Sequence, residues 1–145
     1  MVAFASLCSV ADLSDEALAQ LLHQADAYQT HSNPGEKQVS QEMAQARESQ
    51  KTVALIFFEP STRTRISFEQ AARQLGAKTI LVDTNTSSYN KGESLLDAAR
   101  TLESLGVDAL VVRHPMAGAA QFLAQHTSLP CINAGDGCHE HPTQA

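Results

Sequence analysis

The chain has 145 residues, of which 43% are hydrophobic and 18% are charged, a composition typical of a folded domain and not of a disordered segment. Ten basic residues against sixteen acidic ones give a formal net charge of −6, which argues against nucleic acid or an anionic membrane surface as a partner, because both attract basic surfaces. No apolar run approaches the roughly 18 residues of a membrane span, and three cysteines are too few for a disulfide framework, so we expect a cytoplasmic protein with reduced thiols.

The amino-terminal third is predicted to be one helix followed by a polar connection. Ser14 can cap the helix, and apolar residues recur with a helical period from Ala17 to Tyr28. The stretch 30–50 is polar and carries a turn signal at 33–35, which predicts a loop or linker.

Strands and helices alternate from residue 52 onward. Strands are predicted at 52–58, 79–82, 109–112 and 131–133, helices at 62–75, 93–105 and 117–125, and loops at 83–92 and 134–140, with Gly76 and Gly106 ending two helices and Pro142 suiting the first turn of another. The strands are apolar without alternation, so both of their faces should be covered. This pattern predicts an α/β fold: a three-layer α/β/α, doubly wound parallel sheet of about four strands.

Basic side chains are concentrated in the segments that directly follow the predicted strands, at the carboxyl ends where sheets of this kind bind their ligands. Four of the ten basic residues follow strands: Arg63, Arg65, Lys91 and Arg113. In an acidic chain this concentration indicates an anionic ligand.

The segment from Ser61 to Arg65 has the sequence Ser-Thr-Arg-Thr-Arg and lies between a buried strand and a helix. Ser61 is placed to cap that helix, whose first N–H groups are unpaired and form an anion site with the helix dipole. Hydroxyl and guanidinium groups add donors that match phosphate oxygens. The alternative is an ordinary capped helix with arginines facing solvent.

Two further segments have both a binding and a structural interpretation. The hydroxyl-rich loop 86–93 contains Lys91 and either is a solvated surface loop or reaches the anion site of a neighbouring subunit. Arg113 follows the third strand and either binds phosphate or a developing oxyanion, or forms an ion pair with Asp83 or Asp136.

The last segment places His141 next to a helix start, where the dipole disfavours its charged form. A neutral imidazole can donate one hydrogen bond to a carbonyl oxygen, and Gln144 offers an amide one turn later. The alternative is that His141 is a loop histidine with no functional role. No metal is expected, because the nearby Cys131, Cys138 and His139 lack the spacing of a structural zinc site. Nothing identifies a base that would activate Cys138 as a nucleophile.

Taken together, these segments resemble the aspartate/ornithine carbamoyltransferase family. The resemblance rests on Phe57-Phe58-Glu59-Pro60-Ser61-Thr62-Arg63-Thr64-Arg65, Lys91-Gly92-Glu93-Ser94, Arg113-His114-Pro115, Asn133-Ala134-Gly135-Asp136-Gly137 and His141-Pro142-Thr143-Gln144, in this order. It extends from about residue 11 to 145 and implies that residues 1–145 are the amino-terminal, carbamoyl-phosphate-binding domain. The acceptor-binding domain would then be absent, and we expect a truncated chain or one half of a two-domain protein.

The resemblance also implies roles for individual residues. Carbamoyl phosphate would bind to Ser61, Thr62, Arg63, Thr64, Arg113, His141 and Gln144 of one subunit and to Ser87 and Lys91 of the adjacent subunit. Thr64, Arg113 and His141 would stabilise the oxyanion of the reaction, and Arg65 would support the site without touching ligand. A homotrimer with shared active sites is implied, with regulatory chains as further candidate partners and with no metal or organic cofactor.

The activity implied is transfer of the carbamoyl group from carbamoyl phosphate to the amino group of L-aspartate, which gives N-carbamoyl-L-aspartate and phosphate in de novo pyrimidine (UMP) biosynthesis. The segments 113–115 and 135–137 favour aspartate over ornithine as the acceptor. Two alternatives remain open: a non-catalytic module that binds carbamoyl phosphate or oligomerises, and an ornithine carbamoyltransferase.

Overall fold

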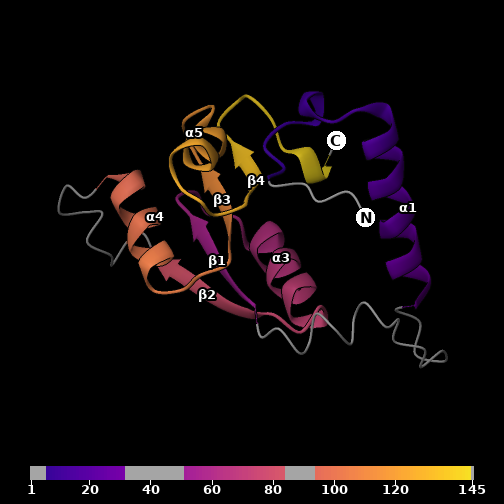
Figure 1. Cartoon of the computed structure of the whole chain (residues 1–145), viewed down its shortest axis with the longest axis horizontal. Helices are drawn as coiled ribbons and strands as arrows, with labels where there is room; N and C mark the ends of the chain where they lie inside the picture. The colour runs from indigo at the N-terminus through magenta and orange to yellow at the C-terminus, as the bar shows by residue number, and fades with distance from the viewer. Residues whose placement is uncertain (1–5, 32–50, 84–93, 145) are drawn as a thin grey trace.

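A computed structural model describes residues 6–31, 51–83 and 94–144 of the chain (Figure 1). In chain order the elements are η1 (Val10–Asp12), α1 (Asp15–His31), β1 (Thr52–Phe57), α3 (Thr62–Gln74), β2 (Lys78–Asp83), α4 (Leu95–Ser104), β3 (Ala109–His114), α5 (Ala119–His126), β4 (Cys131–Asp136) and η3 (Pro142–Gln144). Most of the predicted loop 30–50, together with Ser87 and Lys91, lies outside the described residues.

The four described strands form one parallel sheet in the order β2-β1-β3-β4. From β1 the chain moves outward to β2, crosses back to β3 on the other side of β1, and continues to β4. The predicted doubly wound α/β fold is therefore confirmed. No helix in the described ranges is long and apolar enough to cross a membrane.

Helices cover both faces of the sheet, as the apolar strands predict (Figure 1). On one face Ala54, Ile56 and Leu110 pack with buried residues of α4 and α5. On the other face Leu55 and Val111 form a smaller cluster with Phe68 of α3. Alternate residues of β1 thus contribute to two different cores, which explains why this strand is apolar throughout.

Local signals define the helix ends. The hydroxyl of Ser14 accepts a hydrogen bond from Ala17 N at 3.2 Å, and Ser94 caps α4 in the same way at 3.1 Å. Helix α3 ends at Gln74, and Gly76 follows the C-cap residue Leu75 with a φ of +80°, in the left-handed region that glycine adopts without strain. The predicted cap at Ser14 and this predicted helix end are confirmed, whereas α4 begins at Leu95, after Ser94, and not at the predicted residue 93.

Strands β3 and β4 are longer than predicted, and this changes the position of several site residues. β3 includes Arg113 and His114, and β4 continues to Asp136, whereas the sequence pattern placed these residues in loops. The extension is due to pairing between strands: His114 is in register with Asp136, after a register shift that follows Val112. Phe58 N also donates to Arg113 O at 2.9 Å, so Arg113 is held by backbone bonds.

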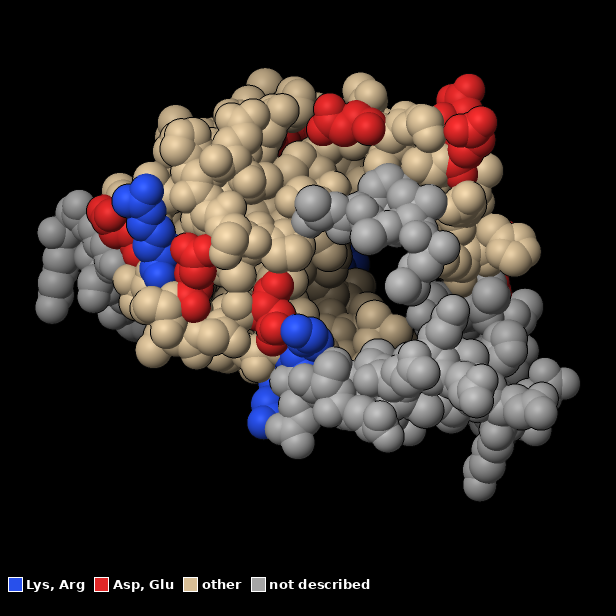
Figure 2. Space-filling model, in the orientation of Figure 1, with Lys and Arg blue, Asp and Glu red and all other residues tan. Residues whose placement is uncertain are grey.

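Helix α1 stands apart from the sheet (Figure 1). Acidic side chains lie over its first turn, at the upper right of Figure 2, where the helix dipole favours negative charge. Its predicted apolar face is only partly covered: Ala17 is buried, but Leu22 is 55% exposed. Leu7, before the helix, makes an isolated parallel bridge to Ile132 at the edge of β4.

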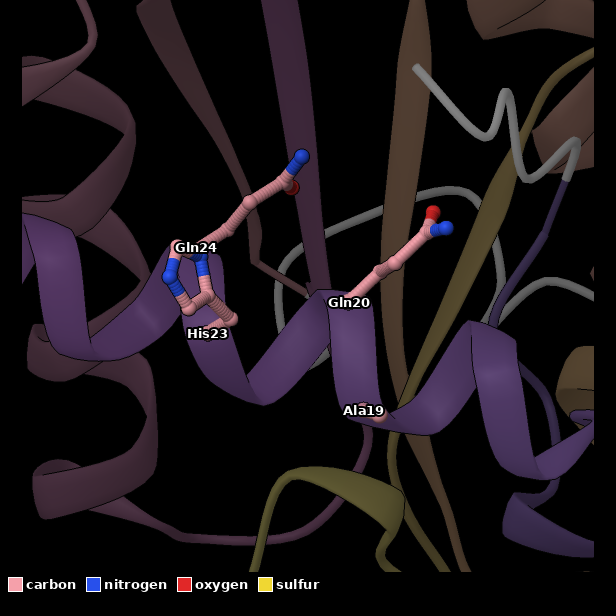
Figure 3. A pocket seen from close by; sticks show the side chains of 4 residues that line it. All are labelled: Ala19, Gln20, His23 and Gln24. Atoms are coloured by element: carbon pink, nitrogen blue, oxygen red, sulfur yellow. The ribbon is translucent and has the colours of Figure 1, made fainter.

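A shallow hollow of about 420 Å³ is lined by residues of α1. Gln20 and Gln24, one helical turn apart, project from the helix there beside Ala19 and His23 (Figure 3). None of the described residues predicted to bind ligand lines this hollow, and its lining side chains carry no formal charge when His23 is neutral. It therefore does not correspond to the predicted anion site.

The central strand β3 offers a test of the fold. Leu110→Ala should lower the free energy of unfolding by about 2–5 kcal/mol, because Leu110 is fully buried and its truncation leaves a cavity. The matched control is Leu105→Ala, since Leu105 is 72% exposed and its change should stay within about 0.5 kcal/mol. Urea unfolding of the two variants and the parent measures the difference. Equal effects would contradict the placement of β3 in the core.

Candidate functional site

The carboxyl ends of β1 and β3 meet where the direction of the chain across the sheet reverses. β1 continues through α3 to β2 on one side, and β3 continues through α5 to β4 on the other. The arrowheads of β1, β3 and β4 lie together at one edge of the sheet (Figure 1). Doubly wound sheets bind ligands in the crevice at this point.

The start of α3 supplies backbone donors at the end of β1. Ser61 occupies the cap position, as predicted, but its side chain makes no capping hydrogen bond. The N–H groups of Thr62, Arg63 and Thr64 precede the first helical bond, which runs from Arg65 N to Ser61 O at 3.0 Å. Three N–H groups and the Ser61 hydroxyl are therefore available to an anion at the positive end of the helix dipole.

Arg113 projects from the end of β3 and is held at two points. Its Nη1 donates to Ala134 O at 3.1 Å, and its Nε lies 3.4 Å from Glu59 Oε2. The second contact is an ion pair without hydrogen-bond geometry, because Nε is buried and has no hydrogen-bond partner. Among the described side chains the ion-pair partner of Arg113 is Glu59 and not the predicted Asp136. The side chain of Asp83, the other predicted partner, lies outside the described residues.

Arg113 and His141 meet against Gly135. A Cβ atom added to Gly135 would lie 2.8 Å from Arg113 Nη1 and 3.2 Å from His141 Cδ2. Gly135 also has a φ of +111°, which side chains rarely allow. The absence of a side chain at this position lets the guanidinium and the imidazole approach the end of β4 together.

His141 is half-buried, and its Nε2 atom is buried without a hydrogen-bond partner. Burial is the main cause that lowers the pKa of His141, and the positive charge of Arg113 lowers it further. The predicted neutral imidazole is supported, but the cause differs from the predicted helix dipole. Thr143 Oγ1 lies 3.2 Å from Nδ1; with that hydroxyl donating, Nε2 carries the ring proton and can donate it.

The short helix η3 closes the arrangement. Gln144 Nε2 donates to Thr64 Oγ1 at 3.4 Å, a long contact that links the end of the chain to the start of α3. Gln144 N donates to His141 O at 2.9 Å within the same turn. Thr64, Gln144, His141 and Arg113 therefore surround one region, although they come from three different segments.

Buried donors without partners mark this region as a binding site. Of the buried side-chain nitrogen and oxygen atoms in the described part of the chain, three have no hydrogen-bond partner: Arg65 Nε, Arg113 Nε and His141 Nε2. A buried donor left without a hydrogen bond costs about 1–3 kcal/mol, so Arg113 Nε and His141 Nε2, which lie against Gly135, are candidates for groups that meet a ligand; Arg65 Nε is not placed there by any contact described above. Two of the three belong to residues that the sequence predicted.

Other predicted residues are placed less specifically. Thr62 and Arg63 are exposed in the first turn of α3, and no described side chain forms an ion pair with Arg63. Ser87 and Lys91 lie outside the described residues. No group of three His, Cys, Asp or Glu side chains within the described ranges is arranged to hold a metal ion.

Sequence reasoning missed the groups that hold the site in place. Asp136 is 2% exposed and accepts hydrogen bonds from Gly118 N at 2.6 Å and Glu140 N at 3.1 Å. Burial alone would raise the pKa of Asp136, but these bonds and those from Asn133 and His139 outweigh it, so the pKa is lowered. The flanking Gly135 and Gly137 were the available signal, because two glycines around one carboxylate indicate an unusual backbone.

The chain is similar to known proteins in sequence. The protein-family model described as aspartate/ornithine carbamoyltransferase, carbamoyl-P binding domain, matches residues 5–145. The aspartate carbamoyltransferase catalytic subunit of Koribacter versatilis is 60% identical over 94 residues, which are 65% of this chain and 31% of that protein. The corresponding subunit of Chlorobaculum tepidum is 60% identical over 97 residues, 67% of this chain and 32% of that protein. The chain thus spans about a third of the length of these curated relatives.

Solved structures agree with this similarity. Aspartate transcarbamoylase from Trypanosoma cruzi in complex with carbamoyl phosphate and aspartate superposes with a TM-score of 0.82 at 37% identity, over 96% of this chain and 41% of that one. The catalytic subunit of M. Jannaschii aspartate transcarbamoylase gives a TM-score of 0.77 at 37% identity, over 97% of this chain and 44% of that one.

The environment of His141 predicts its titration. Its pKa should lie below the ordinary 6.5, and Arg113→Gln should raise it part of the way back, because the charge is removed while burial remains. An unfolded chain then binds more protons at this residue than the folded one, so folding loses stability as the pH falls from 6.5 through the lowered pKa. Histidine Cε1–H NMR titration of the parent and the variant measures both values. A His141 pKa at or above 6.5 in the parent would refute the described environment.

Proposed function

This chain belongs to the aspartate/ornithine carbamoyltransferase family, and from that premise we propose that the complete protein transfers the carbamoyl group of carbamoyl phosphate to L-aspartate. The products are N-carbamoyl-L-aspartate and phosphate, and the reaction serves de novo pyrimidine (UMP) biosynthesis. Residues 1–145 form the domain that binds carbamoyl phosphate. The names of the relatives support aspartate as the acceptor.

One observation carries the proposal: unpaired donors from separate segments converge at the switch point of the sheet. The start of α3 presents backbone N–H groups, and Arg113 and His141 contribute buried nitrogens without hydrogen-bond partners, although Arg113 Nε also lies 3.4 Å from Glu59 Oε2. Carbamoyl phosphate has two anionic phosphate oxygens and a carbonyl oxygen, and it needs donors of these kinds. Ser61, Thr62, Arg63 and Thr64 are proposed to bind the phosphate, with Arg113 between phosphate and carbonyl oxygen.

The proposed chemistry is positioning combined with electrostatic stabilisation. The amino nitrogen of aspartate attacks the carbamoyl carbon and forms a C–N bond. Negative charge grows on the carbonyl oxygen, where Thr64, Arg113 and His141 donate hydrogen bonds. The C–O bond to phosphate then breaks, and the leaving phosphate accepts the proton that the amine releases. No protein nucleophile, metal or organic cofactor takes part.

His141 and Gln144 are proposed to bind the carbamoyl group through hydrogen bonds. The Nε2 proton of His141 donates to the carbonyl oxygen, which requires the neutral, Nδ1-acceptor tautomer that Thr143 favours. The side-chain oxygen of Gln144 accepts from the carbamoyl amino group, while its nitrogen contacts Thr64. Arg65 supports the site without touching ligand.

The complete protein is further proposed to act as a homotrimer in the cytoplasm, with regulatory chains as candidate partners. In this assembly Ser87 and Lys91 of one subunit complete the carbamoyl phosphate site of the next. Support for the assembly is the family resemblance of the segment 91–94. Support for the location is that the sequence has three cysteines, too few for the disulfide framework of a secreted domain.

Arginine substitutions on α3 test the phosphate site. In the complete protein, Arg63→Ala should lower kcat for carbamoyl aspartate formation on the order of 10²–10³-fold, because a donor to the transition state is lost. Arg73→Ala on the same helix is the matched control: Arg73 is exposed, pairs with Glu69 at 2.6 Å and should leave turnover unchanged. Steady-state assays with saturating aspartate measure both. Near parental turnover by the Arg63 variant would refute the role of that arginine.

The acceptor and the catalytic competence of the protein are tested by product formation and calorimetry. With carbamoyl phosphate present, aspartate should yield product and ornithine should not, because the relatives are aspartate enzymes. Calorimetry should detect carbamoyl phosphate binding without an acceptor. Product from ornithine alone would identify an ornithine carbamoyltransferase, and binding without product from either amino acid would identify a non-catalytic binding module.

A further inference from the structure

We propose that Asp136 is a positioning residue, whose carboxylate fixes the backbone before His141 and so holds the imidazole beside Arg113. The consequence for catalysis rests on the proposed function. Asp136 itself touches no reacting group, since its carboxylate is buried and fully engaged by protein donors.

Asp136 closes the loop between β4 and His141 by binding both backbone groups of Glu140. Asp136 Oδ1 accepts from Glu140 N at 3.1 Å, and Asp136 N donates to Glu140 O at 3.2 Å. His139 N also donates to Asp136 O at 3.2 Å, and the His139 ring lies 3.2 Å from both carboxylate oxygens. Since His141 directly follows Glu140, these bonds determine where its Cα lies.

The same carboxylate connects this loop to the walls of the site. Its Oδ2 accepts from Gly118 N at 2.6 Å, at the start of α5. Its Oδ1 accepts from Asn133 Nδ2 at 3.0 Å, and Asn133 Oδ1 in turn accepts from Gly135 N at 2.9 Å. Gly135 is the residue against which Arg113 and His141 pack. The carboxylate of Asp136 therefore connects the backbone before His141 to the end of β4, against which Arg113 packs.

A carboxylate is needed here because donors approach both oxygens. Asparagine has nearly the same shape but replaces one acceptor oxygen with an NH₂ group. Whichever way the amide turns, that group faces a backbone N–H, either of Gly118 or of Glu140. Asp136→Asn therefore disturbs the loop while keeping the size of the side chain.

The experiment is a double-mutant cycle on kcat in the complete protein, with Asp136→Asn, His141→Ala and the combined variant. Asp136→Asn should lower kcat at least about 10-fold, and His141→Ala on the order of 10²-fold. If Asp136 acts through His141, adding Asp136→Asn to His141→Ala should change kcat less than about 3-fold. If the two substitutions lower kcat by factors that multiply in the combined variant, the proposal is overturned. Asp136→Asn would then lower kcat by a route that does not involve His141, such as a general loss of folded structure.

Asp108→Asn is the matched control. Asp108 also accepts from a backbone N–H, that of Thr52 at 2.8 Å, but it lies at the amino ends of β1 and β3, away from the site. It should affect stability without lowering kcat. Where Asp136→Asn does not fold, Asp136→Glu keeps the charge, displaces it and enters the same cycle with the same expected result.

Histidine NMR separates this proposal from the proposed function. In Asp136→Asn the pKa of His141 should move toward 6.5, because a released loop exposes the ring and lengthens its distance to Arg113; Asp108→Asn should not move it. An unchanged His141 titration in Asp136→Asn would overturn the positioning role. A parent protein that makes no carbamoyl aspartate would overturn the proposed function, while the titration still decides the role of Asp136.

Discussion

The parallel pairing of β1 with β3, at the point where the chain reverses its direction across the sheet, is the constraint on which the site depends. The two strands are more than fifty residues apart in sequence. Five register pairs, from Val53↔Ala109 to Phe57↔Arg113, bring their carboxyl ends together. The helix after β1 then begins beside the arginine that ends β3. Each segment supplies only part of the donors that are proposed to bind the phosphorylated ligand.

Much of this arrangement could be predicted from the sequence, because it depends on local signals. Apolar strands, Ser14 as a helix cap and Gly76 as a helix end determine local conformation within a few residues. The rule that ligands bind at the carboxyl ends of parallel strands then brings Thr64, Arg113 and His141 together without any knowledge of distances. The motifs themselves, read as a family resemblance, indicated the roles.

What could not be predicted depends on contacts between segments far apart in the chain. The ends of β3 and β4 were missed because Gly135 and Asp136 are residues typical of loops, and only pairing with His114 makes them part of a strand. The partner of Arg113 proved to be Glu59, which lies close by only because β1 and β3 are neighbours. The pKa of His141 is lowered mainly by burial and further by the charge of Arg113, and both depend on packing between distant segments.

The close approach at Gly135 has an evolutionary consequence. The volume that a side chain at position 135 would occupy is filled by the guanidinium of Arg113, so the two positions share one space. Neither can be altered independently: a larger residue at 135 is compatible only with a shorter or redirected one at 113. Divergent members of the family should therefore show correlated substitutions at the two positions, with glycine retained at 135 wherever arginine is retained at 113.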